Sequence, residues 1–419
     1  MQLSRFGKKF TSDAGITSLM DDLGNALASG EDIIMMGGGN PGFLPEVEDA
    51  FRRRMQQLVD NPALFRRLVG VYDPPQGELE FVQAITAFLN REYGWSLTDK
   101  NVALTNGSQS AFFILFNMLA GESADGTFRR IQLPLIPEYI GYADAGLADD
   151  FFSANRPSIE LIDDHLFKYH VDFESLAVNT DTAALCVSRP TNPTGNVLTD
   201  GEVEGLDLLA RKSGVPLIID GAYGTPFPHL IYGDATPIWN ENIVLCLSLS
   251  KLGLPAARTG IVVASEEVVK SVSGINAIIN LATGSLGAML ALDMVQSGEI
   301  KRLSREVIRP VYQQKAERAV ALLSQLLVGL PYRIHKPEGA MFLWLWLEGL
   351  PVTNRVLYER LKSKSVLVVS GNYFFPGLQG EWSHTNECIR ITYSQDDARV
   401  EAGIRIIADE IRTLFHQGV

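Results

Sequence analysis

The chain has 419 residues, of which 46% are hydrophobic and 20% charged, and its formal net charge is −13 at pH 7. This length allows two or three domains, and the composition is ordinary for a globular protein in water. The negative charge, with no basic cluster longer than Arg52-Arg53-Arg54, argues against nucleic acid or an anionic membrane as a partner. The longest aliphatic and aromatic run, residues 341–347, is far shorter than the roughly 20 residues of a membrane span.

The cysteines and the N-terminal segment give no sign of an extracellular or metal-binding protein. Cys186, Cys246 and Cys388 lie far apart and form neither a CxxC pair nor a metal-ligand spacing. Cys186 and Cys246 lie in apolar runs, which is typical of buried reduced thiols. The first fifteen residues contain no apolar signal core. We therefore expect a cytoplasmic protein without a metal site.

The first 300 residues alternate between apolar runs and amphipathic segments. Helical spacing predicts helices over 46–59, 78–93 and 109–121, the last closed by Gly121, and a further helix over 199–214 capped by Thr199 or Asp200. Apolar runs bounded by turn residues predict strands over 101–106, 130–135, 183–188, 215–220, 242–248 and 259–265. Buried strands that alternate with helices indicate an α/β domain whose mostly parallel sheet is covered on both faces.

A second, smaller α+β domain is expected at the C-terminal end. A long amphipathic helix begins near residue 300. Short strands over 332–336, 341–347, 365–369 and 388–393 follow, and then a final helix from about residue 395. We place the large domain at 41–300 and the small domain at 1–40 and 301–419, with the N-terminal residues forming an arm.

The segment "GGGNPG" at 37–42 matches the dinucleotide-binding spacing G-x-G-x-x-G, but its surroundings do not. That motif needs a helix that begins inside it, and here Pro41 follows Asn40 directly. No strand ending in Asp or Glu follows about 20 residues later, as the ribose contact requires. We therefore reject a dinucleotide site.

Several polar side chains follow directly after predicted strands. Lys251 comes where a buried run stops, although lysine loses its hydration on burial. Asp220 ends another strand, and Asn192 lies in the turn after a third. Each has an ordinary explanation: Lys251 as a solvated residue at a strand end, Asp220 as a helix cap and Asn192 as a turn residue. Together they mark the carboxyl edge of an α/β sheet, where ligands bind.

The chemistry of this set matches one cofactor. The amides of Gly107, Ser108 and Gln109 before a helix form an anion site, and Ser248, Ser250 and Arg258 add donors that suit a phosphate. The Lys251 amine can condense with an aldehyde, and Asp220 can pair with a protonated pyridine nitrogen. Tyr223 and Asn192 can donate to a phenolate oxygen, and Tyr139 can stack on the ring. Phosphate, aldehyde, pyridinium and phenolate together describe pyridoxal 5′-phosphate.

The order of these motifs resembles that of the fold-type I pyridoxal-phosphate aminotransferases. The matching segments are "GGGNP", "YDPPQG", "TNGSQSA", "PEYIGYAD", "SRPTNPTG", "DGAY", "SLSK" and "IRITY". The resemblance implies a mostly parallel seven-stranded sheet, with Lys251, Asp220 and Tyr223 as catalytic residues. Arg258 follows Lys251 by seven residues, one fewer than in the common family pattern.

The resemblance also implies how substrates and subunits are arranged. Arg390 would clamp the α-carboxylate of the substrate, flanked by Gly39 and Asn192. The substrates implied are a small aliphatic amino acid, valine or alanine, and a 2-oxo acid, pyruvate or 2-oxoisovalerate. Tyr72 would reach the cofactor phosphate of a second subunit, so a homodimer with shared active sites is expected. The Asn192-Pro193 peptide bond is expected to be cis.

Other functions remain as alternatives, and one is an aminotransferase of other substrate range on the same fold. A C–S β-lyase on the same fold would use the same lysine, aspartate and arginine but release pyruvate from a cysteine derivative alone. A transcription regulator built on an aminotransferase body would need a basic helix-turn-helix ahead of residue 30, and we expect none in the short, nearly neutral start.

Overall fold

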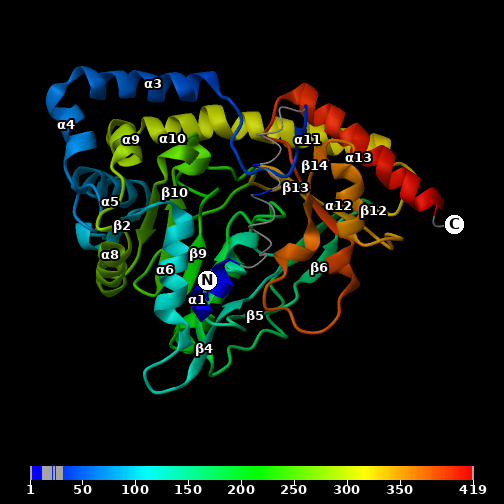
Figure 1. Ribbon diagram of the computed structural model, residues 1–419, viewed down its shortest axis with the longest axis horizontal. Helices are drawn as coiled ribbons and strands as arrows, with labels where there is room; N and C mark the ends of the chain where they lie inside the picture. The colour runs from blue at the N-terminus through cyan, green and yellow to red at the C-terminus, as the bar shows by residue number, and fades with distance from the viewer. Residues whose placement is uncertain (1, 12–20, 22–23, 25–31, 418–419) are drawn as a thin grey trace.

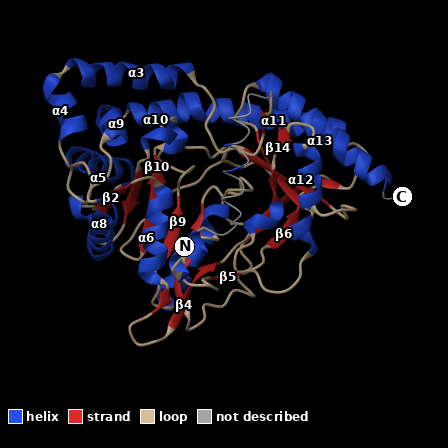
Figure 2. Ribbon diagram, viewed as in Figure 1, coloured by secondary structure: helices blue, strands red, loops and turns tan. Residues whose placement is uncertain are grey.

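The computed structural model describes residues 2–11, 21, 24 and 32–417. Part of the expected N-terminal arm therefore lies outside the described residues. Figure 1 shows two lobes, each with its own sheet, and Figure 2 shows helices around the strands of both. Among the helices of the described residues, none is long and apolar enough to cross a membrane.

The larger sheet lies in the lobe that the first 300 residues form. Its strands run in the order β2-β11-β10-β9-β8-β4, and β4 pairs at its outer edge with both β3 and β5. All pairs are parallel except those that involve β11 and β3. The strands are β2 (Val102–Thr105), β3 (Gly121–Glu122), β4 (Phe128–Leu133), β5 (Phe152–Ala154), β8 (Thr182–Ser188), β9 (Leu217–Asp220), β10 (Ile243–Ser248) and β11 (Gly260–Val263).

The apolar runs of the sequence account for this sheet, because every residue of β8, β9, β10 and β11 is buried. Within the described chain the sheet has eight strands, so the expectation of seven is corrected. The additional strand is β3, which folds back on Phe128 and Arg129. Ser123 donates to the Thr127 carbonyl at 2.8 Å and closes the hairpin between the two strands.

Helices pack against this sheet and around its edges. Helix α6 packs on β2, β4, β10 and β11, and α7 packs on β8 and β9. Thr199 and Glu202 form a capping box at the start of α7, as the predicted cap requires. The helices of this lobe are α3 (Pro45–Asp60), α4 (Pro62–Gly70), α5 (Leu79–Tyr93), α6 (Ser108–Leu119), α7 (Asp200–Lys212), α8 (Glu266–Asn280) and α9 (Leu286–Ser297), with the short α1 (Arg5–Phe10) before them.

The second sheet has six strands in the order β15-β16-β13-β12-β7-β6. They are β6 (Ser158–Leu161), β7 (Leu166–His170), β12 (Tyr332–His335), β13 (Phe342–Leu347), β15 (Val369–Ser370) and β16 (Cys388–Thr392). Strands β6 and β7 come from the segment that we expected in the large domain, and they join the other four through the parallel pair β7–β12. The sheet is therefore built from two distant parts of the chain, while the domain limits at 41 and 301 stay a prediction.

A helical run joins the two lobes. It consists of α10 (Glu299–Arg302), a π-helical turn over Leu303–Ile308, and α11 (Arg309–Leu326), which Figure 1 shows in yellow crossing toward α13 (Asp397–Gln417). Pro310 has no N–H to continue the regular hydrogen-bond pattern, which accounts for the irregular turn before it. Helix α12 (Asn354–Lys362) belongs to the lobe of the second sheet. The parallel pair β1 (Ile34–Met35) and β14 (Val366–Leu367) ties the N-terminal segment to that lobe.

Candidate active site

A cavity of about 480 Å³ lies between the carboxyl ends of the parallel strands and the second sheet. Most of the predicted site residues line it: Gly39, Ser108, Gln109, Tyr139, Asn192, Asp220, Tyr223, Ser248, Ser250, Lys251, Arg258 and Arg390. Gly107 lies directly behind the Arg258 guanidinium. Tyr72 does not line the cavity of its own subunit.

Lys251 lies in the short 3₁₀ turn over Ser250–Leu252 that follows β10. Its Nζ donates to the Gly39 carbonyl at 2.5 Å and lies 5.4 Å from the centre of the Tyr223 ring. Burial, together with the positive charges of Arg390 and Arg258, lowers the pKa of Lys251 to about 8. An amine with this pKa is partly neutral near physiological pH, as a nucleophile must be.

Asp220 ends β9, and its carboxylate is fixed from two sides. The Tyr142 hydroxyl donates to Oδ2 at 2.7 Å, and the Ala222 N–H donates to Oδ1 at 2.9 Å. Burial raises the pKa of Asp220, and these two hydrogen bonds oppose that shift. The sequence analysis missed Tyr142, although it lies in the same "PEYIGY" segment as Tyr139.

A second buried carboxyl group stands near Asp220. Glu138 accepts from the Ser188 N–H at 2.8 Å and from the Ser188 hydroxyl at 2.6 Å. Burial raises the pKa of Glu138 to about 8 in spite of these donors, and the charge of Asp220 adds to the shift. Its place after a buried strand is the only signal for Glu138 in the sequence.

Arg258 lies against Gly107 in the loop before α6, the loop expected to bind a phosphate. A Cβ on Gly107, whose φ is +85°, would lie 2.2 Å from Arg258 Nη2, so only glycine fits there. Arg258 Nη1 lies 3.5 Å from the Ser250 hydroxyl. The loop from Lys251 to Arg258 is one residue shorter than in the common family pattern, but it still brings Arg258 beside Gly107 and the N-terminus of α6.

Arg390 on β16 brings the second sheet into the cavity. Its Nη1 donates to Asn192 Oδ1 at 2.6 Å, and its Nη2 donates to the Gly37 carbonyl at 2.6 Å. The rings of Phe342 and Phe374 lie 4.2 and 5.3 Å from its guanidinium carbon. Burial lowers the pKa of Arg390 to about 10, and its Nε has no hydrogen-bond partner within the described part of the chain. A desolvated guanidinium of this kind favours a bound carboxylate.

The prediction of a cis Asn192-Pro193 bond is wrong. In the described chain the cis X-Pro bonds are Ile136-Pro137, Arg189-Pro190, Thr225-Pro226 and Phe227-Pro228. The turn that presents Asn192 is closed instead by backbone hydrogen bonds, from Gly195 N–H to the Thr191 carbonyl and from Thr191 N–H to the Asn196 carbonyl, both 2.8 Å. Gly195, at φ +73°, allows the chain to reverse within this turn.

Tyr72 lies on the surface after α4, with 80% of its area exposed. The next residue, Asp73, accepts a hydrogen bond from the Ser285 hydroxyl at 2.5 Å, which ties this segment to the loop before α9. Its reach into a partner subunit stays a prediction. Among the described residues, no three His, Cys, Asp or Glu side chains form a group that could hold a metal ion.

Comparison with known proteins connects this site to a family. Residues 155–407 match the family model described as aminotransferase class I and II. The chain is 48% identical over 411 residues to valine–pyruvate aminotransferase of Escherichia coli K12, with 98% of each chain covered.

Two crystal structures are similar over nearly the whole chain. One, from Psychrobacter arcticum 273-4 and assigned to the amino-acid aminotransferases, has a TM-score of 0.96 at 46% identity and 99% coverage of both chains. The other, valine–pyruvate aminotransferase of Salmonella typhimurium LT2, has a TM-score of 0.88 at 45% identity and covers 96% of this chain and 100% of that one. The chain belongs to the class I and II aminotransferase family.

Proposed function

We propose that the protein catalyses pyridoxal-phosphate-dependent transamination between valine or alanine and a 2-oxo acid, pyruvate or 2-oxoisovalerate. The observation that carries the proposal is the placement of Lys251, whose amine lies in one cavity with Asp220 and Arg390. The similarity to the two valine–pyruvate aminotransferases supports the choice of substrates.

The donors of the cavity fit pyridoxal phosphate. Gly107, Ser108, Ser250 and Arg258 would hold the phosphate, because they combine a helix N-terminus with hydroxyl and guanidinium donors. When bound, the cofactor supplies an aldehyde that bonds to amines and a ring that accepts electrons.

The residues at the other end of the cavity would hold the ring. The Asp220 carboxylate would pair with the ring nitrogen. Tyr223 and Asn192 would donate hydrogen bonds to the phenolate oxygen of the ring, and Tyr139 would lie against the ring face. Gln109 and Ser248 complete the wall, and the Gln109 amide is held by the Gly141 carbonyl at 3.0 Å.

The residues of the chain divide the remaining work. Arg390 binds the substrate carboxylate, with Asn192 and the 37–39 backbone beside it, and so orients the α-carbon. Lys251, lowered in pKa, takes the proton from that α-carbon and later returns one. The Asp220 carboxylate would pair with the ring nitrogen and keep that nitrogen protonated.

The cavity also favours a substrate with a single carboxylate. Of the described residues that line it, the cations are Lys251, Arg258 and Arg390, and each already has a role. Among these described lining residues, no cation remains to pair with a second carboxylate. Met35, Ile140 and Pro190 add apolar surface to the cavity wall. This lining suits a short aliphatic side chain.

We further propose a homodimer with shared active sites. Apolar side chains stand exposed in the segments around Tyr72 and before α9: Val71 is 58%, Ile278 88% and Leu281 60% exposed. The hydrogen bond from Ser285 to Asp73 joins these segments into one surface. A cytoplasmic location stays a prediction.

The test is a two-substrate assay. The purified protein, loaded with pyridoxal phosphate, should form alanine from valine and pyruvate and form neither product when one substrate is left out. Aspartate in place of valine should react at least about tenfold more slowly, because its second carboxylate finds no partner. Release of pyruvate from a cysteine derivative alone, without amino-group transfer, would instead assign a C–S β-lyase.

A further inference from the structure

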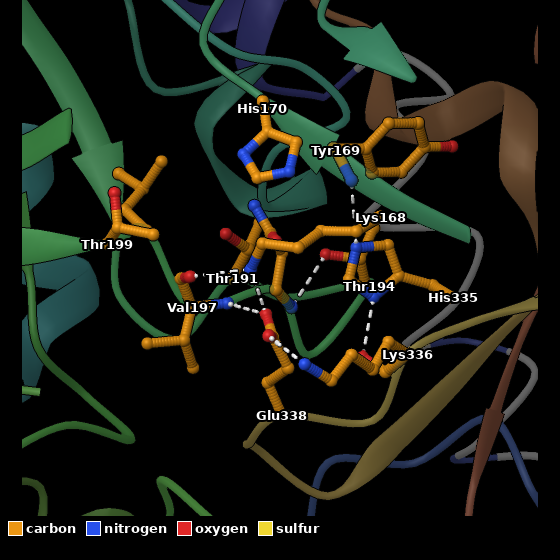
Figure 3. A network of polar contacts seen from close by, with 12 residues as sticks. Lys168, Tyr169, His170, Thr191, Thr194, Val197, Thr199, His335, Lys336 and Glu338 are labelled. Atoms are coloured by element: carbon orange, nitrogen blue, oxygen red, sulfur yellow. Dashed lines mark hydrogen bonds and ion pairs between the residues drawn. The ribbon is translucent and has the colours of Figure 1, made fainter. Parts of the chain in front are cut away.

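A largely buried ion pair lies against the segment that follows the turn presenting Asn192, with side-chain exposures of 7% and 15%. Lys168 on β7 is 5% exposed and pairs with Glu338, which lies in the segment between β12 and β13. Figure 3 shows the two side chains meeting below the chain segment at Val197. The reaction as described uses neither of them, although a buried charge pair is costly to desolvate.

The pair holds both polar groups of one backbone unit. Lys168 Nζ donates to the Val197 carbonyl at 2.9 Å, and the Val197 N–H donates to Glu338 Oε2 at 3.2 Å. Burial would raise the pKa of Glu338, but the charge and hydrogen bond of Lys168 hold that pKa below its ordinary value. Lys336 pairs with the other carboxylate oxygen at 3.2 Å. The carboxylate is therefore ionised and fixed in place.

Val197 directly follows the closed turn of residues 191–196. A Cβ on Gly195 would lie 2.6 Å from the Gly339 carbonyl oxygen. Gly339, the residue after Glu338, therefore packs closely against this turn. The turn is thus held at its exit by the ion pair and along its side by the backbone of the same segment.

The opposite side of the turn carries Asn192, whose Oδ1 accepts from Arg390 Nη1 at 2.6 Å. Both partners are buried, Asn192 at 6% and Arg390 at 3% exposure. A shift of the turn would therefore change the direction of the guanidinium fork that receives the substrate carboxylate.

We propose that Lys168 and Glu338 are positioning residues for the substrate carboxylate, acting through Val197 and Asn192 on Arg390. This inference rests on the proposed function for its substrate, but it concerns carboxylate binding and not the chemical step. It assigns a functional role to a pair that would otherwise only hold the segment after β8 against the second sheet.

The variants must not leave a lone charge in the interior, because that alone can unfold the protein. The double change Lys168→Met with Glu338→Gln removes both charges and keeps the side-chain volumes nearly constant. If it fails to fold, Glu338→Asp provides a second test, because it keeps the charge and withdraws the carboxylate by one methylene. Lys301→Met with Glu92→Gln is the matched control, since it breaks another Lys–Glu pair, which joins α10 to α5.

The first measurement is the Kd of isovalerate, a carboxylate that cannot react, for the loaded protein by calorimetry. We expect the double variant to bind isovalerate about tenfold more weakly and to show a similar rise in KM for valine and pyruvate, with kcat changed less than about threefold. The control pair should change Tm and leave Kd and KM unaltered. Unchanged Kd and KM in a folded double variant or in Glu338→Asp would overturn the proposal.

The second measurement combines these changes with Asn192→Ala. If the pair acts through Asn192, adding the double change to Asn192→Ala should weaken isovalerate binding by less than about twofold more. Fully multiplied effects would overturn the route through Asn192. Isovalerate binding that follows these expectations in a protein without valine–pyruvate turnover would overturn the proposed function alone.

Discussion

The Tyr142 hydroxyl and the Asp220 carboxylate form a hydrogen bond of 2.7 Å in the interior, with Tyr142 fully buried and Asp220 8% exposed. Three aromatic rings surround Tyr142, those of Phe112, Phe116 and Tyr139, with centroids at 4.9 to 5.4 Å. Packing thus fixes the ring, and the ring fixes the carboxylate. Because burial disfavours the charged form of Asp220, this donor is one of three groups, with the Ala222 N–H and the charge of Lys251, that favour the carboxylate a cofactor nitrogen would need.

Tyr142→Phe should lower kcat by about ten- to a hundredfold, which corresponds to the loss of one hydrogen bond to a charged group. The ring packing would remain, so the fold should persist. Losing the donor raises the pKa of Asp220 further, so the acidic fall of the kcat–pH profile should move to higher pH. A pH series from about 5 to 9 measures both effects.

The matched control is Tyr332→Phe. Tyr332 is equally buried, but its hydroxyl has no hydrogen-bond partner among the described residues. This change should leave the profile in place. If Tyr142→Phe and Tyr332→Phe gave the same profile as the unchanged protein, Tyr142 would serve packing alone.

The lowered pKa of Lys251 predicts how the cofactor attaches. Only the neutral amine attacks an aldehyde, so the rate of condensation with pyridoxal phosphate should rise with pH and level off above a midpoint near 8. Stopped-flow absorbance of the cofactor-free protein measures this rate. Reduction with borohydride should then fix the cofactor to a peptide that contains Lys251. A midpoint near 10.5, or a label on another lysine, would refute the assignment.

Arg390→Lys should raise KM about ten- to a hundredfold for the amino acid and for the 2-oxo acid alike. An ammonium cannot reproduce the planar fork that meets a carboxylate with two parallel bonds. Both substrates carry this carboxylate, so both should suffer. Steady-state kinetics in each direction test the expectation, and a change confined to one substrate would contradict a shared clamp.

Much of this fold and site follows from local patterns in the sequence. The apolar runs predict β8 to β11 because those strands are buried on both faces, and the polar residues after them predict Asp220 and Lys251 because parallel strands end at one edge. The donor chemistry of the loops then predicts a phosphate cofactor.

The remaining features depend on contacts between distant parts of the chain. Nothing in residues 166–170 shows that they pair with β12, and nothing in Glu338 shows that it meets Lys168, 170 positions away. Tyr139 and Tyr142 lie in the same short segment, and only the folded chain shows that Tyr142 is the one that meets Asp220. The error at the Asn192-Pro193 bond has a local origin, because hydrogen bonds inside the turn and Gly195 at positive φ close it with a trans bond.

The exposed Tyr72 predicts complementation between subunits. In a homodimer with shared sites, Tyr72 of one subunit completes the phosphate site of the other. Lys251→Ala should be inactive in both sites, and Tyr72→Ala should be weakened in both, by about tenfold for one lost hydrogen bond to a phosphate. In a mixed dimer, the site that keeps Lys251 would receive an intact Tyr72 from the Lys251→Ala chain.

Mixing the two variants under conditions that exchange subunits should therefore give more activity than the sum of the two parents. Phe65→Ala, on α4 and 44% exposed, replaces Tyr72→Ala in the control mixture. That mixture should gain nothing, because the Phe65→Ala chain already carries both Lys251 and Tyr72. If Tyr72 serves its own subunit, the site with Lys251 always lacks it, and exchange cannot restore activity. Mass spectrometry of the intact dimers establishes that exchange has taken place. Equal activity before and after exchange, with the mixed dimer present, would then reject the shared site.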